Sequence, residues 1–277
     1  WGYTKKGIPE GQAEIIVCEG NFHGRTISVV SFSTEGQYKN GFGPFTPGFR
    51  VIPFGDAQAL RAAITLNTCG FLLEPIQGEA GIIIPPDGFL GEAADICREN
   101  RVLFMADEIQ SGLGRTGKML ACMHENVQPD VLIIGKALAG GFYPVSAVLG
   151  SKEILGVFQP GDHGSTFGGN PLACALARTA LRILVDEKLV ERSAELGAYF
   201  LEKLQTLRSP AILEIRGRGL WIAIELNRDA RPYCEALKEA GILSKETHDT
   251  IIRIAPPLVI ERDEIDWAFD RIAKVLG

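Results

Sequence analysis

Two short, almost wholly apolar runs, Val102–Ala106 and Val131–Ile134, dominate the middle of the chain. Runs of this length, rich in Val, Ile, Leu and Phe, are typical of strands buried on both faces of a parallel sheet that helices cover. Asp107 directly follows the first run, and Lys136 follows the second after one glycine. Because ligands bind beyond the carboxyl ends of such strands, we expect both side chains to face one site.

The rest of the pattern alternates strands with helices. In the first two thirds it predicts strands over 13–18, 50–53, 70–73 and 144–149 and helices over 57–66 and 86–100. A long helix is predicted to open at Asn170-Pro171, since Asn is a favourable N-cap and Pro suits the first helical position. Beyond Asp186 the pattern predicts helices over 190–207, 232–240 and 265–276 and strands over 219–226 and around 251–260.

This order of elements indicates an α/β protein. We expect a large domain with a mainly parallel sheet over residues 1–187 and a smaller α+β domain over 188–277. Because the chain has 277 residues, it is long enough for both domains to have a core of their own.

Composition narrows the function classes. The net charge is −6 and the isoelectric point about 5.4, so a nucleic-acid role has no electrostatic support. No apolar run approaches the roughly 18 residues of a membrane helix. The six cysteines include no C-x-x-C pair and the four histidines are dispersed, so we expect reduced thiols and no metal site. We expect the protein to be cytoplasmic, or to lie in the mitochondrial matrix if the source is eukaryotic.

Lys136 and Asp107 together suggest a specific chemistry. A lysine in a partly desolvated site loses its proton more readily and can form a Schiff base. Pyridoxal phosphate needs such a lysine and an acidic partner for its pyridine nitrogen. The alternative is structural, with a lysine that closes one strand and an aspartate that caps the next helix.

Two glycine motifs lack the context of a nucleotide site. Gly112–Gly117 fits G-x-G-x-x-G, but a dinucleotide fingerprint directly follows a strand and opens a helix, whereas residues 107–111 intervene here. Gly135-Lys136 is not a P-loop, because Asp130 occupies the position of the first glycine.

Three polar features have two interpretations each. His163–Thr166 lies in a Gly-rich loop ahead of a helix, where hydroxyls and free amides suit a phosphate, although a solvated turn has the same composition. Arg25 and Arg253 each lie beside an apolar segment and suit either a substrate carboxylate or a structural salt bridge.

Seven stretches together resemble the class III (ω-amino acid) aminotransferases, which are pyridoxal-phosphate enzymes of fold type I. In family order they are NFHGRT (21–26), GFGPFTPGF (41–49), EPIQGEAG (74–81), ADEIQSGLGRTGK (106–118), GKALAGGFYPVSAV (135–148), HGSTFGGNPLA (163–173) and IIRIAPPLVI (251–260). The resemblance covers nearly the whole chain. It implies a fold-type I transferase with a cofactor-binding large domain and a small C-terminal domain.

The resemblance also implies site residues. Lys136 would carry the cofactor and shuttle a proton, and Asp107 would bind the pyridine nitrogen. The other implied cofactor contacts are Phe22, which would stack on the ring, Gln110 at its 3-oxygen, Ser165 and Thr166 at the phosphate across a dimer interface, and His23. The implied substrate contacts are Arg25, Glu74, Glu79 and Arg253, with Glu79 neutralising Arg253 for one of the two substrates.

The implied activity is transfer of the δ-amino group of L-ornithine to 2-oxoglutarate in a homodimer or higher homo-oligomer. Within the resemblance, residues 41–49 and 140–148 favour ornithine over N-acetylornithine or another ω-amino acid. Chains of this family begin upstream of Trp1, so we expect the large domain to be N-terminally incomplete. A non-catalytic, aminotransferase-like fragment is therefore a further alternative.

Overall fold

A computed structural model describes residues 1–277, which divide into two compact units. The first unit comprises Trp1–Pro75, Pro85–Gln110 and Cys122–Ala180, and the second Ile76–Ile84, Ser111–Ala121 and Leu181–Gly277. Two stretches from the first half of the chain thus belong to the second unit. The functional division at residue 187 stays a prediction.

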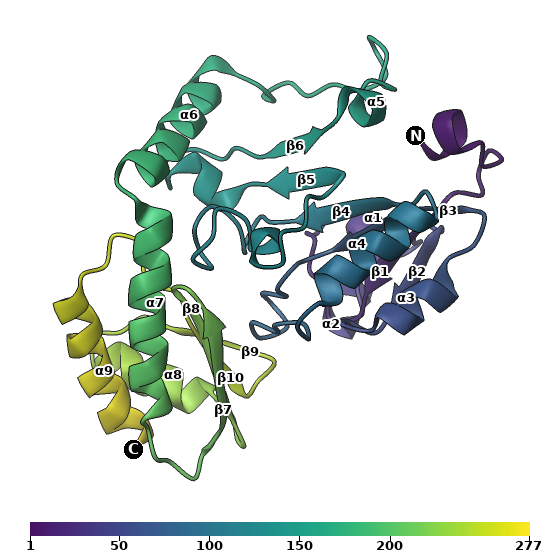
Figure 1. Cartoon of the computed structure of the whole chain (residues 1–277). Coiled ribbons are helices and arrows are strands. Elements are labelled where there is room, and N and C mark those ends of the chain that lie inside the picture. The colour runs from purple at the N-terminus through teal and green to yellow at the C-terminus, as the bar shows by residue number, and fades with distance from the viewer. The chain divides into compact units, whose positions relative to one another are not determined.

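The first unit is built on a six-stranded sheet in the order β2-β1-β3-β4-β5-β6 (Figure 1). Its strands are β1 (Glu14–Cys18), β2 (Phe49–Ile52), β3 (Thr68–Leu73), β4 (Leu103–Asp107), β5 (Val131–Ile134) and β6 (Ala147–Gly150). Neighbouring strands from β2 to β5 are all parallel, and β6 runs antiparallel to β5 at the edge. The predicted mainly parallel sheet is confirmed.

Helices precede, connect and follow these strands. They are η1 (Gly2–Lys6), α1 (Ile27–Ser31), α2 (Gly36–Lys39), α3 (Ala57–Ala63), α4 (Phe89–Glu99), η2 (Ala121–His124), η3 (Lys136–Ala139) and α5 (Lys152–Leu155), and α6 (Pro171–Asp186) leads into the second unit. The predicted start of α6 is confirmed, because Asn170 Oδ1 accepts a hydrogen bond from the Ala173 N–H at 2.9 Å.

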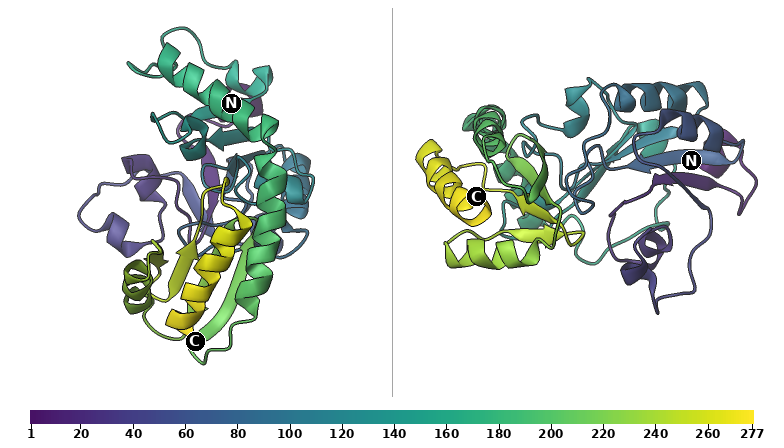
Figure 2. Two further views of the ribbon diagram at one scale, coloured as in Figure 1. Left: turned by 90° about the vertical axis from the view of Figure 1, so that its left-hand side faces the viewer. Right: turned by 90° about the horizontal axis from the view of Figure 1, so that it is seen from below.

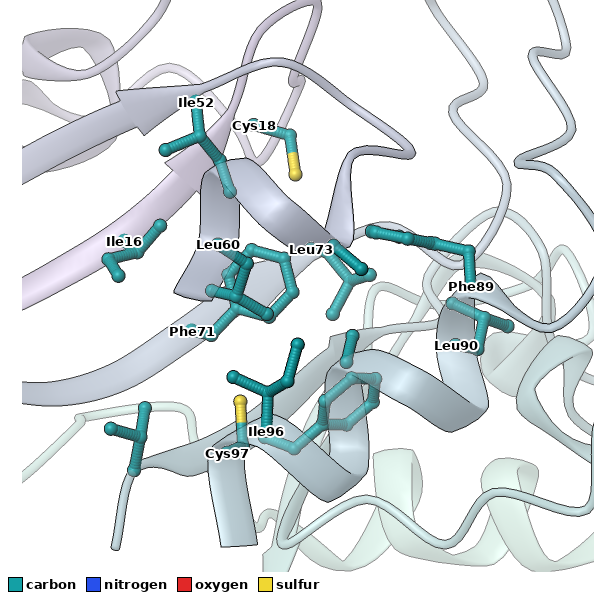
Figure 3. Close-up of a cluster of buried hydrophobic side chains, with 14 of the residues drawn as sticks. Ile16, Cys18, Ile52, Leu60, Phe71, Leu73, Phe89, Leu90, Ile96 and Cys97 are labelled. Atoms are coloured by element: carbon teal, nitrogen blue, oxygen red, sulfur yellow. The ribbon is translucent and has the colours of Figure 1, made fainter. Parts of the chain in front are cut away.

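The main core of the first unit lies where α3 and α4 cover one face of the sheet (Figure 3). Leu60 from α3 and Ile96 and Cys97 from α4 meet Phe71 and Leu73 from β3, and all five are fully buried. The buried positions of α4 recur every three or four residues, as the period of 3.6 requires for a helix with one apolar face.

The second unit contains a four-stranded antiparallel sheet in the order β7-β8-β10-β9. Its elements are α7 (Leu189–Gln205), β7 (Ile212–Arg218), β8 (Trp221–Leu226), α8 (Arg231–Glu239), β9 (Lys245–Thr247), β10 (Ile251–Ile254) and α9 (Arg262–Leu276). The helices α7, α8 and α9 lie on one side of this sheet (Figure 2). None of the helices is long and apolar enough to cross a bilayer.

Successive side chains of β8 point to opposite faces of this sheet. Ile222 and Ile224 pack toward the helices, whereas Trp221 and Ala223 pack on the opposite face. The prediction of a strand pair around 251–260 is wrong beyond Ile254, where Pro256 and Pro257 cannot donate to a ladder. The sequence pattern also missed β7 and β9.

The G-x-G-x-x-G stretch is a packing motif of the second unit. Residues 112–117 form turns and open no helix. A Cβ at Gly117 would lie 2.9 Å from Ala194 Cα in α7, and one at Gly219 would lie 2.5 Å from Gly117 N, so these backbones approach only because both residues are glycines. Arg115 within the motif donates to the Leu220 and Pro256 carbonyls at 2.8 and 2.6 Å, and burial lowers its pKa to about 10.

Leu60 and Leu66 allow a matched test of the core. Leu60 is 0% exposed and Leu66 is 92% exposed. We expect Leu60→Ala to lower the free energy of unfolding by about 2–5 kcal/mol through lost burial and a cavity, and Leu66→Ala to change it by less than about 0.5 kcal/mol. Urea titration followed by circular dichroism measures both values, and equal losses would contradict the assignment of the core.

Candidate active site

The parallel strands of the first unit bring the predicted residues to one edge of the sheet. Because β1, β3, β4 and β5 run in the same direction, their carboxyl ends meet there. The site residues at this edge are Phe22 and His23 after β1, Glu74 after β3, Asp107 at the end of β4 and Lys136 after β5. The expectation that Asp107 and Lys136 emerge from neighbouring strand ends is confirmed.

Asp107 and His23 form a buried pair. His23 Nδ1 lies 2.7 Å from Asp107 Oδ2, and the two side chains are only 4% and 7% exposed. The other carboxylate oxygen accepts the Ile109 N–H at 3.1 Å. These contacts fix the orientation of the carboxylate, and an ionised Asp107 would set the tautomer that carries its proton on Nδ1. The second ring nitrogen, Nε2, is buried and has no hydrogen-bond partner.

Two further buried carboxylates hold backbone amides. Glu74 Oε2 accepts the Phe22 N–H at 2.9 Å, and Glu108 Oε1 accepts the Cys122 N–H at 2.8 Å. Glu74 therefore ties the loop after β1 to the end of β3. Glu108 has a different partner from its neighbour Asp107, as expected for successive residues at a strand end.

The Arg25 guanidinium lies against two aromatic rings. Its guanidinium carbon lies 3.7 Å from the centroid of Tyr38 and 5.3 Å from that of Phe22. The two rings meet edge to face at 5.7 Å. Nothing in the sequence pattern singles out Tyr38, although aromatic residues are frequent from Tyr38 to Phe49. Cation–π contacts of this kind orient the guanidinium without neutralising it.

Lys136 lies beside a pocket of about 630 Å³ in the first unit. It opens η3 with a φ of +44°, a left-handed conformation that non-glycine residues adopt mainly at special sites. Tyr143, Ser146 and Asn170 are among the polar residues that line the same pocket. Its volume is in the range of small-molecule sites.

Ser165 and Thr166 lie in an exposed loop that continues into the wall of this pocket. Ser165 Oγ accepts the Gly168 N–H at 3.0 Å, and the next residues, Gly168 to Asn170, line the pocket. A phosphate site and a solvated turn both fit this geometry. Gln110 is half-buried three residues beyond Asp107.

The second unit brings Glu79 and Arg253 together. Arg253 Nη1 lies 2.8 Å from Glu79 Oε1, and the side chains are 16% and 21% exposed. Ile252 and Ile254 face the helices, so Arg253 lies on the opposite face of β10. The predicted contact is confirmed, while its role in substrate binding stays a prediction.

A mainly parallel sheet with a lysine and a buried aspartate at adjacent carboxyl ends fits a pyridoxal-phosphate enzyme of fold type I. The chain belongs to the class III aminotransferase family, whose model matches residues 1–276. It is 64% identical to the ornithine aminotransferase of Brevibacillus brevis and 61% identical to that of Bacillus subtilis. In both cases the match covers 100% of this chain and 69% of the relative.

Solved structures show the same fold. The ornithine aminotransferase of Toxoplasma gondii matches with a TM-score of 0.98 and 48% identity, over 100% of this chain and 66% of that one. The acetylornithine aminotransferase of Elizabethkingia anophelis matches with a TM-score of 0.89 and 50% identity. That match covers 100% of this chain and 70% of the other. The chain thus spans about two thirds of these proteins.

The residues of the first unit fit pyridoxal phosphate, which class III aminotransferases use and which partly occupies the active site of the Toxoplasma protein. A lysine lines a pocket of suitable volume, and a buried carboxylate is held in one orientation. The buried His23 Nε2, which lacks a hydrogen-bond partner, is a further polar atom at this edge.

The bond between Glu74 and Phe22 can be tested directly. Glu74→Ala would leave the Phe22 N–H without its acceptor, at a cost of about 1–3 kcal/mol, whereas Glu74→Gln keeps an oxygen in place. We expect amide exchange at Phe22 to be faster in the alanine variant and close to wild type in the glutamine variant. Equal exchange in all three proteins would show that another group holds this loop.

Proposed function

We propose that the protein transfers the δ-amino group of L-ornithine to 2-oxoglutarate and yields glutamate 5-semialdehyde and L-glutamate. The observation that carries this proposal within the family is the Glu79–Arg253 ion pair. The enzyme must accept ornithine by its δ-amine and glutamate by its α-amine. An arginine that a carboxylate can neutralise suits both tasks, because it binds an α-carboxylate only when the pair opens.

Pyridoxal phosphate, when bound, supplies an electron sink for the carbanion that forms next to the transferred amine. Lys136 would hold the cofactor through its amine and move the proton between substrate carbon and cofactor. Asp107 would keep the pyridine nitrogen protonated, and His23 would hold Asp107 in place through the 2.7 Å contact. Phe22 would stack on the ring, and Gln110 would contact its 3-oxygen.

The remaining residues would bind phosphate and carboxylates. Ser165 and Thr166 would hold the phosphate, supported by the pocket wall that follows them. Arg25, oriented by Tyr38, would take a substrate carboxylate, and Arg253 would take the α-carboxylate of glutamate or 2-oxoglutarate. Glu74 would line the substrate pocket as well as hold Phe22.

We also propose a homodimer or higher homo-oligomer, in which Ser165 and Thr166 act across the subunit interface. The first unit supports this with large exposed aromatic side chains, among them Phe142 and Phe167, which are 85% and 75% exposed. Monomeric proteins rarely expose contiguous apolar surface of large extent.

We further propose that the chain has two functional domains, a cofactor-binding domain to residue 187 and a small domain beyond it.

The proposed location is the cytoplasm. All six cysteines are free thiols. Burial raises the pKa of the Cys97 thiol to about 12, which keeps it protonated and unreactive at neutral pH. Unpaired thiols suit a reducing compartment.

Substrate choice separates the proposal from its alternatives. With pyridoxal phosphate and 2-oxoglutarate present, we expect ornithine to react with a much higher kcat/KM than N-acetylornithine or 4-aminobutyrate. Lys136→Ala should lower turnover by about 10³-fold or more while the fold is retained. A preference for N-acetylornithine would identify the other class III activity, and cofactor binding without turnover would support the non-catalytic alternative.

The role of Glu79 predicts which amine reacts. Glu79→Gln removes the charge that neutralises Arg253, and an uncompensated, mostly buried charge is costly, so Arg253 would then recruit the α-carboxylate of ornithine. We expect the ratio of α- to δ-transamination products, measured by mass spectrometry, to rise more than about tenfold. Glu191→Gln, in the exposed first turn of α7, is the matched control. An unchanged product ratio would refute the switch.

A further inference from the structure

Glu79 belongs to a hairpin that lies on the second unit's sheet. We call Ile76–Ile84 the strap. Its ends pair through the Gln77 N–H on the Ile83 carbonyl at 3.0 Å and the Ile83 N–H on the Gln77 carbonyl at 2.9 Å. Its apolar residues Ile76 and Ile82 pack on the sheet face opposite the helices. Glu79 therefore lies near the turn of a short hairpin.

Thr247 holds the backbone of Glu79 from one side. It is the last residue of β9, and its hydroxyl donates a short hydrogen bond to the Glu79 carbonyl. Thr247 pairs in register with Ile251 of β10, which fixes its position in the sheet. The hydroxyl thus contacts the residue whose side chain must move.

Arg216 holds the strap on the other side of Glu79. Its Nη2 and Nε donate to the Gly81 carbonyl at 2.8 and 3.2 Å, and Nε also lies 3.2 Å from the Ile82 carbonyl. Its Nη1 pairs with Glu214 at 2.6 Å and Glu225 at 2.5 Å. Two carboxylates therefore fix the guanidinium while it holds the strap backbone.

The register of the sheet places the two arginines on one face with different tasks. Arg216 on β7 and Arg253 on β10 both pair with Ala223 on the strand between them. Arg216 binds strap backbone, whereas Arg253 binds the Glu79 side chain. Gly81, at φ +112°, lets the strap lie close, because a Cβ there would collide with the Ile251 side chain.

We propose that Thr247 and Arg216 are positioning residues that clamp the strap backbone on both sides of Glu79, so that only the Glu79 side chain moves when Arg253 changes partner. The proposal rests on the proposed function, since it assigns how the Glu79–Arg253 switch is kept in register. A fixed backbone holds the Glu79 carboxylate near Arg253 at high effective concentration. Loss of the clamp lowers that concentration and favours the α-carboxylate of ornithine.

The test uses three threonine variants of the pyridoxal-phosphate-loaded protein. Thr247→Val keeps the shape and removes the hydroxyl, whereas Thr247→Ser keeps the hydroxyl. Thr250→Val is the matched control, because the Thr250 hydroxyl donates to the His248 carbonyl of its own turn. We expect Thr247→Val to raise the α- to δ-product ratio from ornithine about fivefold, the effect of losing one hydrogen bond, with Thr247→Ser and Thr250→Val near wild type.

A second readout does not depend on turnover. Hydrogen exchange of the strap amides, followed by mass spectrometry, should be faster in Thr247→Val and in Arg216→Lys, which loses the forked contact to Gly81 and Ile82. Unchanged strap exchange in both variants would overturn the clamp. Faster exchange with an unchanged product ratio would also overturn it, because the contacts would then be structural only.

The two proposals fail in distinguishable ways. If the wild-type protein makes neither product from ornithine, the proposed function fails. The product ratio then carries no information about the clamp, but unchanged strap exchange in the same variants still overturns it. If ornithine reacts but Thr247→Val and Arg216→Lys behave as wild type, the clamp fails and the proposed function stands.

Discussion

The chemistry of the first unit depends on one constraint, the common direction of β1, β3, β4 and β5. A strand of about five residues is roughly 16 Å long, so reversing β4 or β5 would move Asp107 or Lys136 to the far edge of the sheet. Parallel strands need both faces covered, and the core beneath α3 and α4 supplies one of the two covers. The burial of the sheet and the placement of Asp107 and Lys136 at one edge are thus consequences of the same topology.

In the second unit the corresponding constraint is electrostatic. One face of a four-stranded sheet carries two arginines with a single strand between them, hence about 10 Å apart in the pairing direction. Neither could lie there without partners, because a desolvated cation is costly. Arg216 is neutralised by carboxylates of its own sheet, while Arg253 takes a carboxylate from a distant part of the chain. The first set of pairs lies within neighbouring strands of one sheet, and the second is the pair that we propose a substrate carboxylate replaces.

Much of the fold could be predicted from the sequence where hydrophobic patterning and helix-capping residues indicate the same element. Continuous apolar runs identified β4 and β5, and the Asn170-Pro171 pair identified the start of α6. The strand β7 was missed because Glu214, Arg216 and Arg218 interrupt its apolar pattern, and β9 because it has only three residues. Short-range patterns contain no information about such edge strands, whose pairing partners decide them.

Some residues of the candidate site could likewise be predicted from the sequence, and others could not. The pattern of apolar runs placed Asp107 and Lys136 at neighbouring strand ends, and the family resemblance implied the Glu79–Arg253 contact. Tyr38 and Thr247 were missed, because their contacts join residues that are distant in sequence and ordinary in type. The strap's membership of the second unit is likewise a tertiary property that no local pattern encodes.

The interleaving of the two units has a consequence for how the protein is made. The strap is synthesised early, but its partners Arg216 and Thr247 follow 135 and 168 residues after the atoms they bind. On the ribosome, residues 76–84 must therefore wait, with their apolar side chains uncovered, until most of the chain has emerged. Contacts of such sequence separation form slowly, and this segment cannot dock before its much later binding face has been synthesised.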